Sequence, residues 1–287
     1  MAHLDFDSFH ARNIAIAAML QQRDILIAGA GAIGSTVAMN LALMGANVTT
    51  ADPDALSIAN LPRTKADPEY LGIAKGLAVA ATIRGLVPSA QRVIGLARDL
   101  LQIPQPEVWD LVQRHHAVVA ATGNDDADHL LNWICLNLGV LLVVPSMWPQ
   151  GGVILGDLLV VRPDHQDGTA GCFECLRPAR PDSAPMLEAQ EGLAAEVGMV
   201  ASVISMAVVG TLLPDTDAGR DLDRLLRVGS GYRLIARNPF AVVPVRNRRR
   251  TGCRACAAVQ ERGAQDQPAA PRQGLRLPSA EQIRATL

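Results

Sequence analysis

The chain has 287 residues, of which 49% are apolar and 19% charged, a balance typical of a folded protein with a sizeable core rather than a disordered one. Its formal net charge of −2 argues against binding nucleic acid or anionic lipid through overall charge. Aromatic residues make up 3% of the chain, too few to offer stacking surfaces for single-stranded nucleic acid. We therefore expect one large domain or two modest ones, with no nucleic acid and no membrane as partner.

The amino-terminal residues carry acids and lack the apolar stretch of a secretory signal. We expect residues 1–23 to form a polar arm with a short helix at 8–22. The longest uncharged apolar run, 197–213, is shorter than the roughly 20 residues that cross a bilayer, so it predicts a buried core helix. Together these features indicate a cytoplasmic protein.

The first half of the chain predicts a Rossmann-like α/β fold. Apolar strands alternate with helical patterns, which implies a mostly parallel, doubly wound sheet with helices on both faces. The expected strands begin at residues 25, 47, 92, 117 and 140, and the expected helices span 35–46, 69–87, 106–115 and 126–139.

After residue 148 the pattern changes. Residues 150–163 predict a β-hairpin, and 232–240 and 241–248 predict two late strands, so we expect antiparallel strands to continue the sheet. Residues 261–287 are rich in Gln, Pro and Ala and predict a flexible tail.

A glycine-rich loop follows the first strand. Gly29, Gly31 and Gly34 spell G-x-G-x-x-G at a strand-to-helix turn, where glycines permit a tight turn and let backbone N–H groups approach phosphate oxygens. Asp52, at the end of the second strand, is placed to hold a ribose. The combination predicts a nucleotide site and leaves NAD, FAD and ATP open.

Four polar residues exceed what a dinucleotide site needs: Asp54, Asn60, Arg63 and Lys75. Arginine and lysine near a nucleotide indicate phosphate charge to be neutralised. If a carboxylate attacks the α-phosphorus of ATP, no general base is required, because a carboxylate is already ionised at neutral pH. The protein then has to position the triphosphate, neutralise the departing pyrophosphate and hold Mg²⁺. Hydride transfer needs none of these, so the charges favour ATP.

Three motifs in this order resemble the ThiF family, which includes ubiquitin-activating enzymes and the bacterial adenylyltransferases for the molybdopterin and thiamine sulfur-carrier proteins. They are GAGAIGS at 29–35, DPDALSIANLPR at 52–63 and GIAK at 72–75. The similarity covers roughly residues 10–260.

The resemblance implies roles for individual residues. Asp52 would bind the ribose of ATP, and Asn60, Arg63 and Lys75 would line its phosphates. The segment HARNIAI is similar to the amino-terminal arm of the family. Arg12 would then reach the ATP of the other protomer in a homodimer.

One departure from the family pattern concerns Mg²⁺. The family usually has T-D-N after the strand, with the aspartate on the metal, whereas this chain has TGN at 122–124. Gly123 therefore stands where the acid is expected. We favour a shifted acid, Asp125 or Asp126, as the substitute. Asp54 is a second candidate, and ATP binding without efficient adenylation is a third possibility.

Four of the five cysteines form two C-x-x-C pairs, the usual donors of a closed, tetrahedral structural zinc site: Cys172, Cys175, Cys253 and Cys256. The gap of 77 residues between the pairs is wider than in a zinc ribbon. The same paired knuckles recur in many members of the ThiF family, which favours zinc. Disulfides and two redox turns are the alternatives.

The remaining candidates receive plainer interpretations. Cys135 lies in an apolar helical stretch and predicts a buried core thiol rather than a nucleophile. His115 and His116 follow a helix and are expected to face solvent. The arginine-rich residues 246–250 predict a solvated strand end. The alternative is a basic surface that attracts an acidic patch on a carrier protein. The segment 176–200 has no cysteine, so the chain resembles members that only adenylate.

The resemblance implies an ATP-dependent adenylyltransferase that uses ATP, Mg²⁺ and Zn²⁺. It would activate the C-terminal carboxylate of a ubiquitin-like carrier protein, or of a peptide with a free C-terminus, threaded near residues 145–152. One adenylation domain, 24–260, is expected, with a nucleotide-binding half at 24–150 and a carrier-binding and zinc half at 151–260. The alternatives are a non-catalytic nucleotide-binding scaffold of the same fold and an NAD-dependent oxidoreductase.

Overall fold

The computed structural model describes residues 5–150, 153–161, 171–177, 193–225, 231–235, 241–245 and 247–257. The flexible tail expected at 261–287 lies outside these residues.

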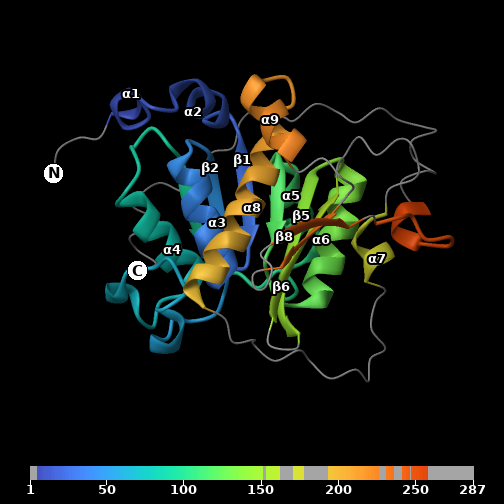
Figure 1. The fold of residues 1–287 in the computed structure, drawn as a ribbon. Helices are drawn as coiled ribbons and strands as arrows, with labels where there is room; N and C mark the ends of the chain where they lie inside the picture. Colours follow the sequence, from blue (N-terminus) through green and yellow to red (C-terminus); the bar gives the residue numbers. More distant parts are fainter. Residues whose placement is uncertain are drawn as a thin grey trace.

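One eight-stranded mixed sheet organises the described residues, in the order β3-β2-β1-β4-β5-β6-β7-β8 (Figure 1). The strands are β1 (Asp24–Ala28), β2 (Asn47–Ala51), β3 (Val93–Leu96), β4 (Ala117–Ala120), β5 (Leu141–Gln150), β6 (Val153–Val161), β7 (Gly231–Ile235) and β8 (Ala241–Val245). Neighbours among β1 to β5 are parallel, and the pairs from β5 to β8 are antiparallel. The predicted fold, a mostly parallel sheet continued by antiparallel strands, is confirmed.

Helices cover both faces of this sheet. They are α1 (Phe6–Phe9), α2 (Ile14–Leu20), α3 (Ala32–Leu43), α4 (Lys75–Arg84), α5 (Gln105–Gln113), α6 (Asp125–Leu138), α7 (Phe173–Leu176), α8 (Ala194–Leu212) and α9 (Asp217–Leu225). One hydrophobic core packs α3, α4 and α8 against one face, and a second packs α5, α6 and α7 against the other. Helix α8 runs alongside α3 in Figure 1.

The two cores explain why the first strand is continuously apolar. In β1, Ile25 and Ile27 enter the core beneath α3 and α8, whereas Leu26 and Ala28 enter the core beneath α5 and α6. Successive side chains of a strand point to opposite faces, so a strand covered on both faces has no polar positions.

Helix α8 is long and apolar enough, by length and composition alone, to cross a membrane. In this fold 56% of its most apolar window is buried inside the protein. Val200 and Ile204 are 3% and 0% exposed, and a Cβ at Gly156 of β6 would collide with the side chain of Val200. This packing confirms the buried core helix that the sequence predicts.

The helix expected at 69–87 is shorter than predicted. A 3-10 turn, Pro68–Tyr70, comes first, Gly72 then adopts φ +85, and α4 begins only at Lys75. A residue in the left-handed region cannot continue a right-handed helix, so the glycine separates the two. As a result, Lys75 lies at the start of α4 rather than in its middle.

Two other expected elements also differ. The helix at 8–22 is two helices, α1 and α2, with His10 between them, 1% exposed and hydrogen-bonded to Gln91 at 3.2 Å. The hairpin expected within 150–163 is formed instead by β5 and β6, because Leu142 to Gln150 pairs with all of β6.

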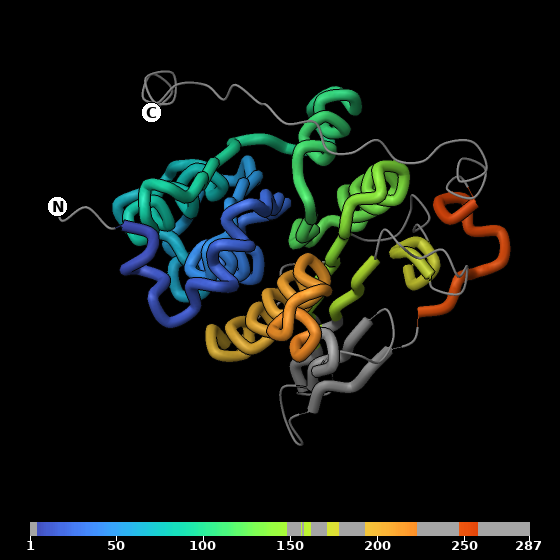
Figure 2. Tube along the Cα trace, turned by 90° about the horizontal axis from the view of Figure 1, so that it is seen from above, coloured from blue at the N-terminus to red at the C-terminus, as the bar shows by residue number. Residues whose placement is uncertain are grey.

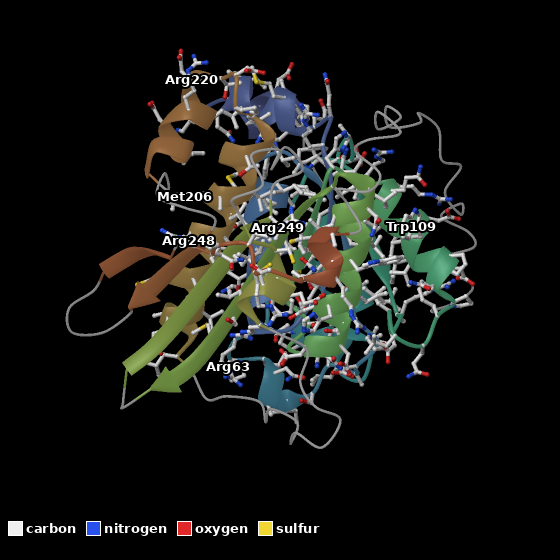
Figure 3. The ribbon with its side chains drawn as sticks, turned by 90° about the vertical axis from the view of Figure 1, so that its right-hand side faces the viewer. Arg63, Trp109, Met206, Arg220, Arg248 and Arg249 are labelled. Carbon is white, nitrogen blue, oxygen red and sulfur yellow. The ribbon has the colours of Figure 1, made fainter. Side chains whose placement is uncertain are left out.

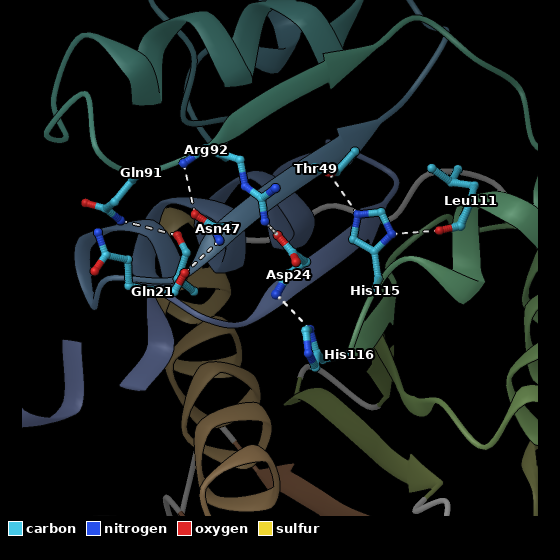
Figure 4. A network of polar contacts seen from close by, with 10 residues as sticks. Gln21, Asp24, Asn47, Thr49, Gln91, Arg92, Leu111, His115 and His116 are labelled. Atoms are coloured by element: carbon cyan, nitrogen blue, oxygen red, sulfur yellow. Dashed lines mark hydrogen bonds and ion pairs between the residues drawn. The ribbon is translucent and has the colours of Figure 1, made fainter. Parts of the chain in front are cut away.

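A polar network joins the amino-terminal ends of β1 and β2 (Figure 4). The ring of His115 hydrogen-bonds Thr49 Oγ1 at 2.9 Å and the Leu111 carbonyl at 2.7 Å. Nδ1 of His116 accepts the Asp24 N–H at 3.0 Å. Burial lowers the pKa of both histidines. The expectation that they face solvent is wrong, because the turn before β4 directs the His116 ring to β1 and the His115 ring to β2, and both are partly buried.

Candidate functional site

The candidate site lies at the carboxyl ends of β1 and β4. β1 lies between β2 and β4 in the sheet, so the connection after β1 leads to one side and the connection after β4 to the other. Such a switch point opens a crevice at the strand ends, and ligands of doubly wound sheets bind there. The glycine-rich loop follows β1, and the TGN segment at 122–124 follows β4.

Two of the three loop glycines are required by close packing. Gly29 has φ +88, and a Cβ there would collide with the carbonyl group of Ala121 in the loop after β4. A Cβ at Gly34 would collide with the carbonyl oxygen of Gly29. Gly31, the N-cap of α3, differs because no protein atom lies within 4 Å of the place that its Cβ would take. This space leaves the start of α3 open to an anion.

Asp52 lies directly beside the loop, at the end of β2, and is 8% exposed. Its Oδ2 accepts the Ala30 N–H at 2.8 Å, and its Oδ1 accepts the Asp54 N–H at 3.0 Å. Burial raises the pKa of this carboxyl in spite of the two donors. Asp52 therefore ties the glycine loop to the segment after β2, and its oxygens keep lone pairs for a ribose hydroxyl.

Lys75 and Asp54 form an ion pair next to this carboxylate. Lys75 Nζ lies 3.0 Å from Asp54 Oδ2, and the Lys75 N–H donates to the Asp54 carbonyl at 2.7 Å. The lysine side chain is 14% exposed and the aspartate side chain 71%. A Cβ at Gly76 would collide with the backbone of Leu96, so a glycine here lets the start of α4 approach the strand ends closely. The charge of the ammonium group acts on the nearby Asp52 carboxyl and partly offsets the rise that burial gives its pKa.

Asn60 and Arg63 lie on the segment between β2 and α4. Asn60 Oδ1 accepts the N–H and the hydroxyl of Ser57, at 3.0 and 2.9 Å, which closes a 3-10 turn. The Arg63 N–H donates to the Asn60 carbonyl at 3.0 Å, and Figure 3 labels Arg63 on this segment. The turn therefore fixes the Asn60 amide and the backbone of Arg63 on the loop that carries Asp54.

Arg12 lies exposed between α1 and α2. The arm packs against the rest of the domain at Gly45. A Cβ at this glycine would collide with the backbone of Ala17 in α2. The role of Arg12 in the ATP site of a partner stays a prediction.

The turn after β4 is organised by side-chain hydrogen bonds. Gly123 has φ +66, and no protein atom lies within 4 Å of its missing Cβ. Asn124 caps α6, because its Oδ1 accepts the N–H groups of Asp126 and of the next residue at 2.9 and 3.3 Å. Thr122 Oγ1 donates to Asp128 Oδ1 at 2.7 Å. The first turn of the helix that begins here, α6, carries three acids: Asp125, Asp126 and Asp128.

These acids differ in their surroundings. Asp126 is exposed, whereas Asp125 has a 23% exposed side chain whose Oδ1 lies 3.8 Å from Nη1 of Arg177. Asp128 is 5% exposed, and burial raises its pKa to about 7. Neither Asp128 nor Arg177 is assigned a role from the sequence. The only feature of the sequence that points to Asp128 is its place in the acidic run 125–128. The only feature that points to Arg177 is its position just after a C-x-x-C pair.

The four paired cysteines meet beside α6, where Figure 2 shows residues 171–177 next to 247–257. Their Sγ atoms all lie within 4.8 Å of one another. The separations are 3.9 Å for Cys172 and Cys175, 3.7 Å for Cys172 and Cys253, and 3.6 Å for Cys175 and Cys256. A tetrahedral zinc site with Zn–S bonds of about 2.3 Å places its sulfurs about 3.8 Å apart. The cluster therefore fits a zinc ion.

Polar groups of neighbouring segments contact the cluster. The Arg250 N–H donates to Cys175 Sγ at 3.3 Å, and Asn247 Nδ2 holds the Cys172 carbonyl at 2.8 Å. A hydrogen bond with the Cys256 thiol and burial raise the pKa of Cys172, so the neutral thiol is favoured unless a bound cation stabilises the thiolate. The buried Asn132 Nδ2 has no hydrogen-bond partner among the described residues. A metal-bound sulfur would give this N–H an acceptor.

Cys135 is fully buried, and burial raises its pKa. It packs in the core between α6 and the sheet. The predicted core thiol is confirmed.

Comparison with known proteins identifies the family. A profile of the ThiF family matches residues 7–258. The chain belongs to the ThiF family. A search of curated proteins found no significant match.

Solved structures share the fold of this ThiF-family chain. Escherichia coli MccB in complex with MccA-N7isoASN has a TM-score of 0.68 and 14% sequence identity, with 88% of this chain and 76% of that chain covered. E. coli MccB with ATP has a TM-score of 0.66 and 14% identity, with 87% and 71% covered. PaaA has a TM-score of 0.60 and 15% identity, with 82% and 78% covered. Identity this low shows the fold alone.

Family membership confirms the resemblance drawn from the three motifs. The structure ties Asp52 to the glycine loop after β1 and pairs Lys75 with Asp54 close to Asp52, and it places Asp125 and Asp126 at the neighbouring loop after β4. The cysteine cluster lies beside the same helix that carries these two acids.

Proposed function

We propose that this ThiF-family protein is an ATP-dependent adenylyltransferase that activates the C-terminal carboxylate of a peptide or small carrier protein as an acyl-adenylate. The observation that carries the proposal is the open start of α3 at Gly31, with Asp52 bonded to the same loop and Lys75 near Asp52. Backbone N–H groups and an ammonium group suit a polyphosphate, and a carboxylate suits a ribose. The solved structures of MccB with ATP, and with AMPCPP and MccA, support this assignment.

In the proposed reaction, a carboxylate oxygen attacks the α-phosphorus of ATP. The bond from that phosphorus to its bridging oxygen breaks, and pyrophosphate leaves with the electron pair. The nucleophile is already ionised, since an α-carboxyl has a pKa of roughly 3.5, so no general base is needed. Lys75 and Arg63 would neutralise the phosphates and Asn60 would orient them. Arg12 of the other protomer would add a further cation.

Mg²⁺ would neutralise phosphate charge and help orient the triphosphate. Asp125 and Asp126 would hold it in place of the acid that is missing at Gly123. Both offer carboxylate oxygens, the donors that Mg²⁺ prefers, in the first turn of α6. Asp54 is the second candidate, and its exposed carboxylate lies on the other side of the glycine loop.

Zn²⁺ would occupy the cysteine cluster. Four thiolates close a tetrahedral site and leave no position for water, so this metal would stabilise the fold rather than take part in adenylation. No cysteine lies between residues 176 and 200, so the proposed product is the acyl-adenylate itself.

The substrate would approach along β5 near residues 145–152. A ubiquitin-like carrier is implied by family resemblance, and a peptide is the alternative partner. We propose a homodimer, because the role assigned to Arg12 requires a second protomer. A cytoplasmic location is part of the same proposal.

Calorimetric titration with ATP, with and without Mg²⁺, and with NAD⁺ as control, tests the proposal. We expect ATP binding that depends on Mg²⁺ and no binding of NAD⁺. Pyrophosphate exchange in the presence of candidate carriers or peptides then tests the chemistry.

One observation favours a second candidate function, a nucleotide-binding scaffold, because Gly123 offers no carboxylate. ATP binding that is indifferent to Mg²⁺, without pyrophosphate exchange, would support the scaffold. Binding of NAD⁺ in place of ATP would support an oxidoreductase.

A further inference from the structure

One face of α6 holds the cysteine knuckle, which we define as residues 172–176 together with 253–256. The Phe173 N–H donates to Asn132 Oδ1 at 3.0 Å, in a buried position. The rings of His129 and Phe173 meet edge to face, with centroids 4.9 Å apart. Asp125 meets Arg177 at 3.8 Å. Residues 125, 129 and 132 are spaced by four and three, so they share one face of the helix.

The knuckle determines where Arg177 lies. Helix α7 has only four residues, too few to be stable alone, so its cysteines and its contacts with α6 must hold it. Arg177 follows Cys175 by two residues, and its N–H donates to the Phe173 carbonyl at 2.8 Å. The guanidinium group is therefore placed by the same backbone that carries two of the four thiols.

Arg177 lies between the acidic turn of α6 and the middle of β5. Its Nη2 donates to Ser146 Oγ at 3.0 Å, while its Nη1 faces Asp125. The positive charge also lowers the pKa of Asp128, which burial and Asp125 raise. Arg177 thus offsets the repulsion between two acids in one helical turn.

We propose that Arg177 is a positioning residue that competes with Mg²⁺ for Asp125 and so sets how much Mg²⁺ the ATP site requires. This inference rests on the proposed function, in which Asp125 is a Mg²⁺ ligand. The ion pair at 3.8 Å is longer than a hydrogen bond, whereas Mg²⁺ coordinates carboxylate oxygens at about 2.1 Å and so would form the closer contact with Asp125. Because the knuckle seats Arg177, the metal of the cysteine cluster is coupled to the metal of the nucleotide site.

Mg²⁺ titrations of ATP binding, followed by calorimetry, test the proposal. Arg177→Ala removes a positive charge next to Asp125. We expect half-maximal Mg²⁺-dependent ATP binding at roughly tenfold lower Mg²⁺, equivalent to about 1.4 kcal/mol. Arg177→Lys keeps the charge and is expected to restore most of the wild-type requirement. Arg250→Ala is the matched control, because it removes an equal charge next to the knuckle from an arginine that pairs with Glu174, at 3.9 Å, instead of Asp125.

Two further comparisons test whether Arg177 acts through Asp125 and whether it links the two metal sites. In the Asp125→Asn background, Arg177→Ala is expected to leave the Mg²⁺ requirement unchanged, because the carboxylate for which the two cations compete is gone. Removal of the knuckle metal with a chelator, with helix content checked by circular dichroism, is expected to lower the requirement in the wild type and to add nothing in Arg177→Ala.

The outcomes separate this inference from the proposed function. If the wild-type protein binds no Mg²⁺-dependent ATP, the proposed function fails. If it does bind, and Arg177→Ala behaves like Arg250→Ala or needs more Mg²⁺ than the wild type, the competition is refuted. If metal removal shifts Arg177→Ala as much as the wild type, Arg177 is not the link between the two sites.

Discussion

Gly29 and Gly31 stand two residues apart in the same loop, and the structure predicts opposite consequences for replacing each by alanine. Gly29 has φ +88, and its Cβ would collide with the Ala121 carbonyl and approach Thr122 Cα to 2.9 Å. Gly31 has φ −73, and its Cβ would meet open space. Gly29→Ala should therefore damage the fold, and Gly31→Ala should damage ATP binding.

The size of the first effect follows from two terms. The left-handed conformation costs an alanine roughly 1–2 kcal/mol, and the collision is with backbone, which cannot move aside cheaply. We expect Gly29→Ala to lower the free energy of unfolding by about 3 kcal/mol or more, which is within the range for strain at special backbone positions. Gly31→Ala should cost no more than about 1 kcal/mol, the value typical of a changed N-cap.

Urea denaturation followed by circular dichroism measures both free energies, and calorimetry measures the affinity for Mg·ATP. Folded Gly31→Ala protein is expected to bind ATP at least tenfold more weakly, because a methyl group then fills the place assigned to a phosphate. Gly29→Ala with wild-type stability would refute the packing argument. Gly31→Ala with wild-type affinity would refute the placement of the triphosphate.

Three other predictions follow from single residues. Burial raises the pKa of Asp128 to about 7 in the folded chain, from about 3.9 in the unfolded chain, so the neutral acid is favoured by folding and stability is lost as pH rises from about 4 through 7. Asp128→Asn keeps an acceptor for Thr122, and its free energy of unfolding in urea should exceed that of the wild type by up to about 4 kcal/mol at pH 8 and match it near pH 4. Equal free energies of unfolding at pH 8 would contradict the burial argument. Elemental analysis should find about one zinc per chain in the wild type and far less in Cys256→Ser, and a metal-free wild type would remove the zinc assignment. Gly123→Asp should lower the free energy of unfolding by less than about 1 kcal/mol, since aspartate tolerates φ +66 and the space is open. The same change should lower the Mg²⁺ concentration needed for ATP binding. An unchanged Mg²⁺ titration would mean that this side chain does not face the metal.

Much of the fold was predictable because its signals are local. The apolar run before Gly29, the helix that ends near Gly45 with φ +110, and the strand that ends at Ala51 each depend on neighbouring residues. The start of α4 was not predicted, because periodicity alone does not reveal that Gly72 adopts a positive φ. The two histidines at the amino end of β4 were misplaced for a related reason, since their partners lie on other strands.

The sequence by itself determined the family, the glycine-rich loop and the candidate donors, because the motifs are short and their spacing is imposed by one turn or one strand. Tertiary structure decided which groups meet. It brought Cys172 beside Cys253 across 81 positions, buried Asp128 while leaving Asp126 exposed, and set Arg177 against Asp125. These contacts depend on the order of strands in the sheet and on which helix face each turn packs against, and no local pattern encodes either.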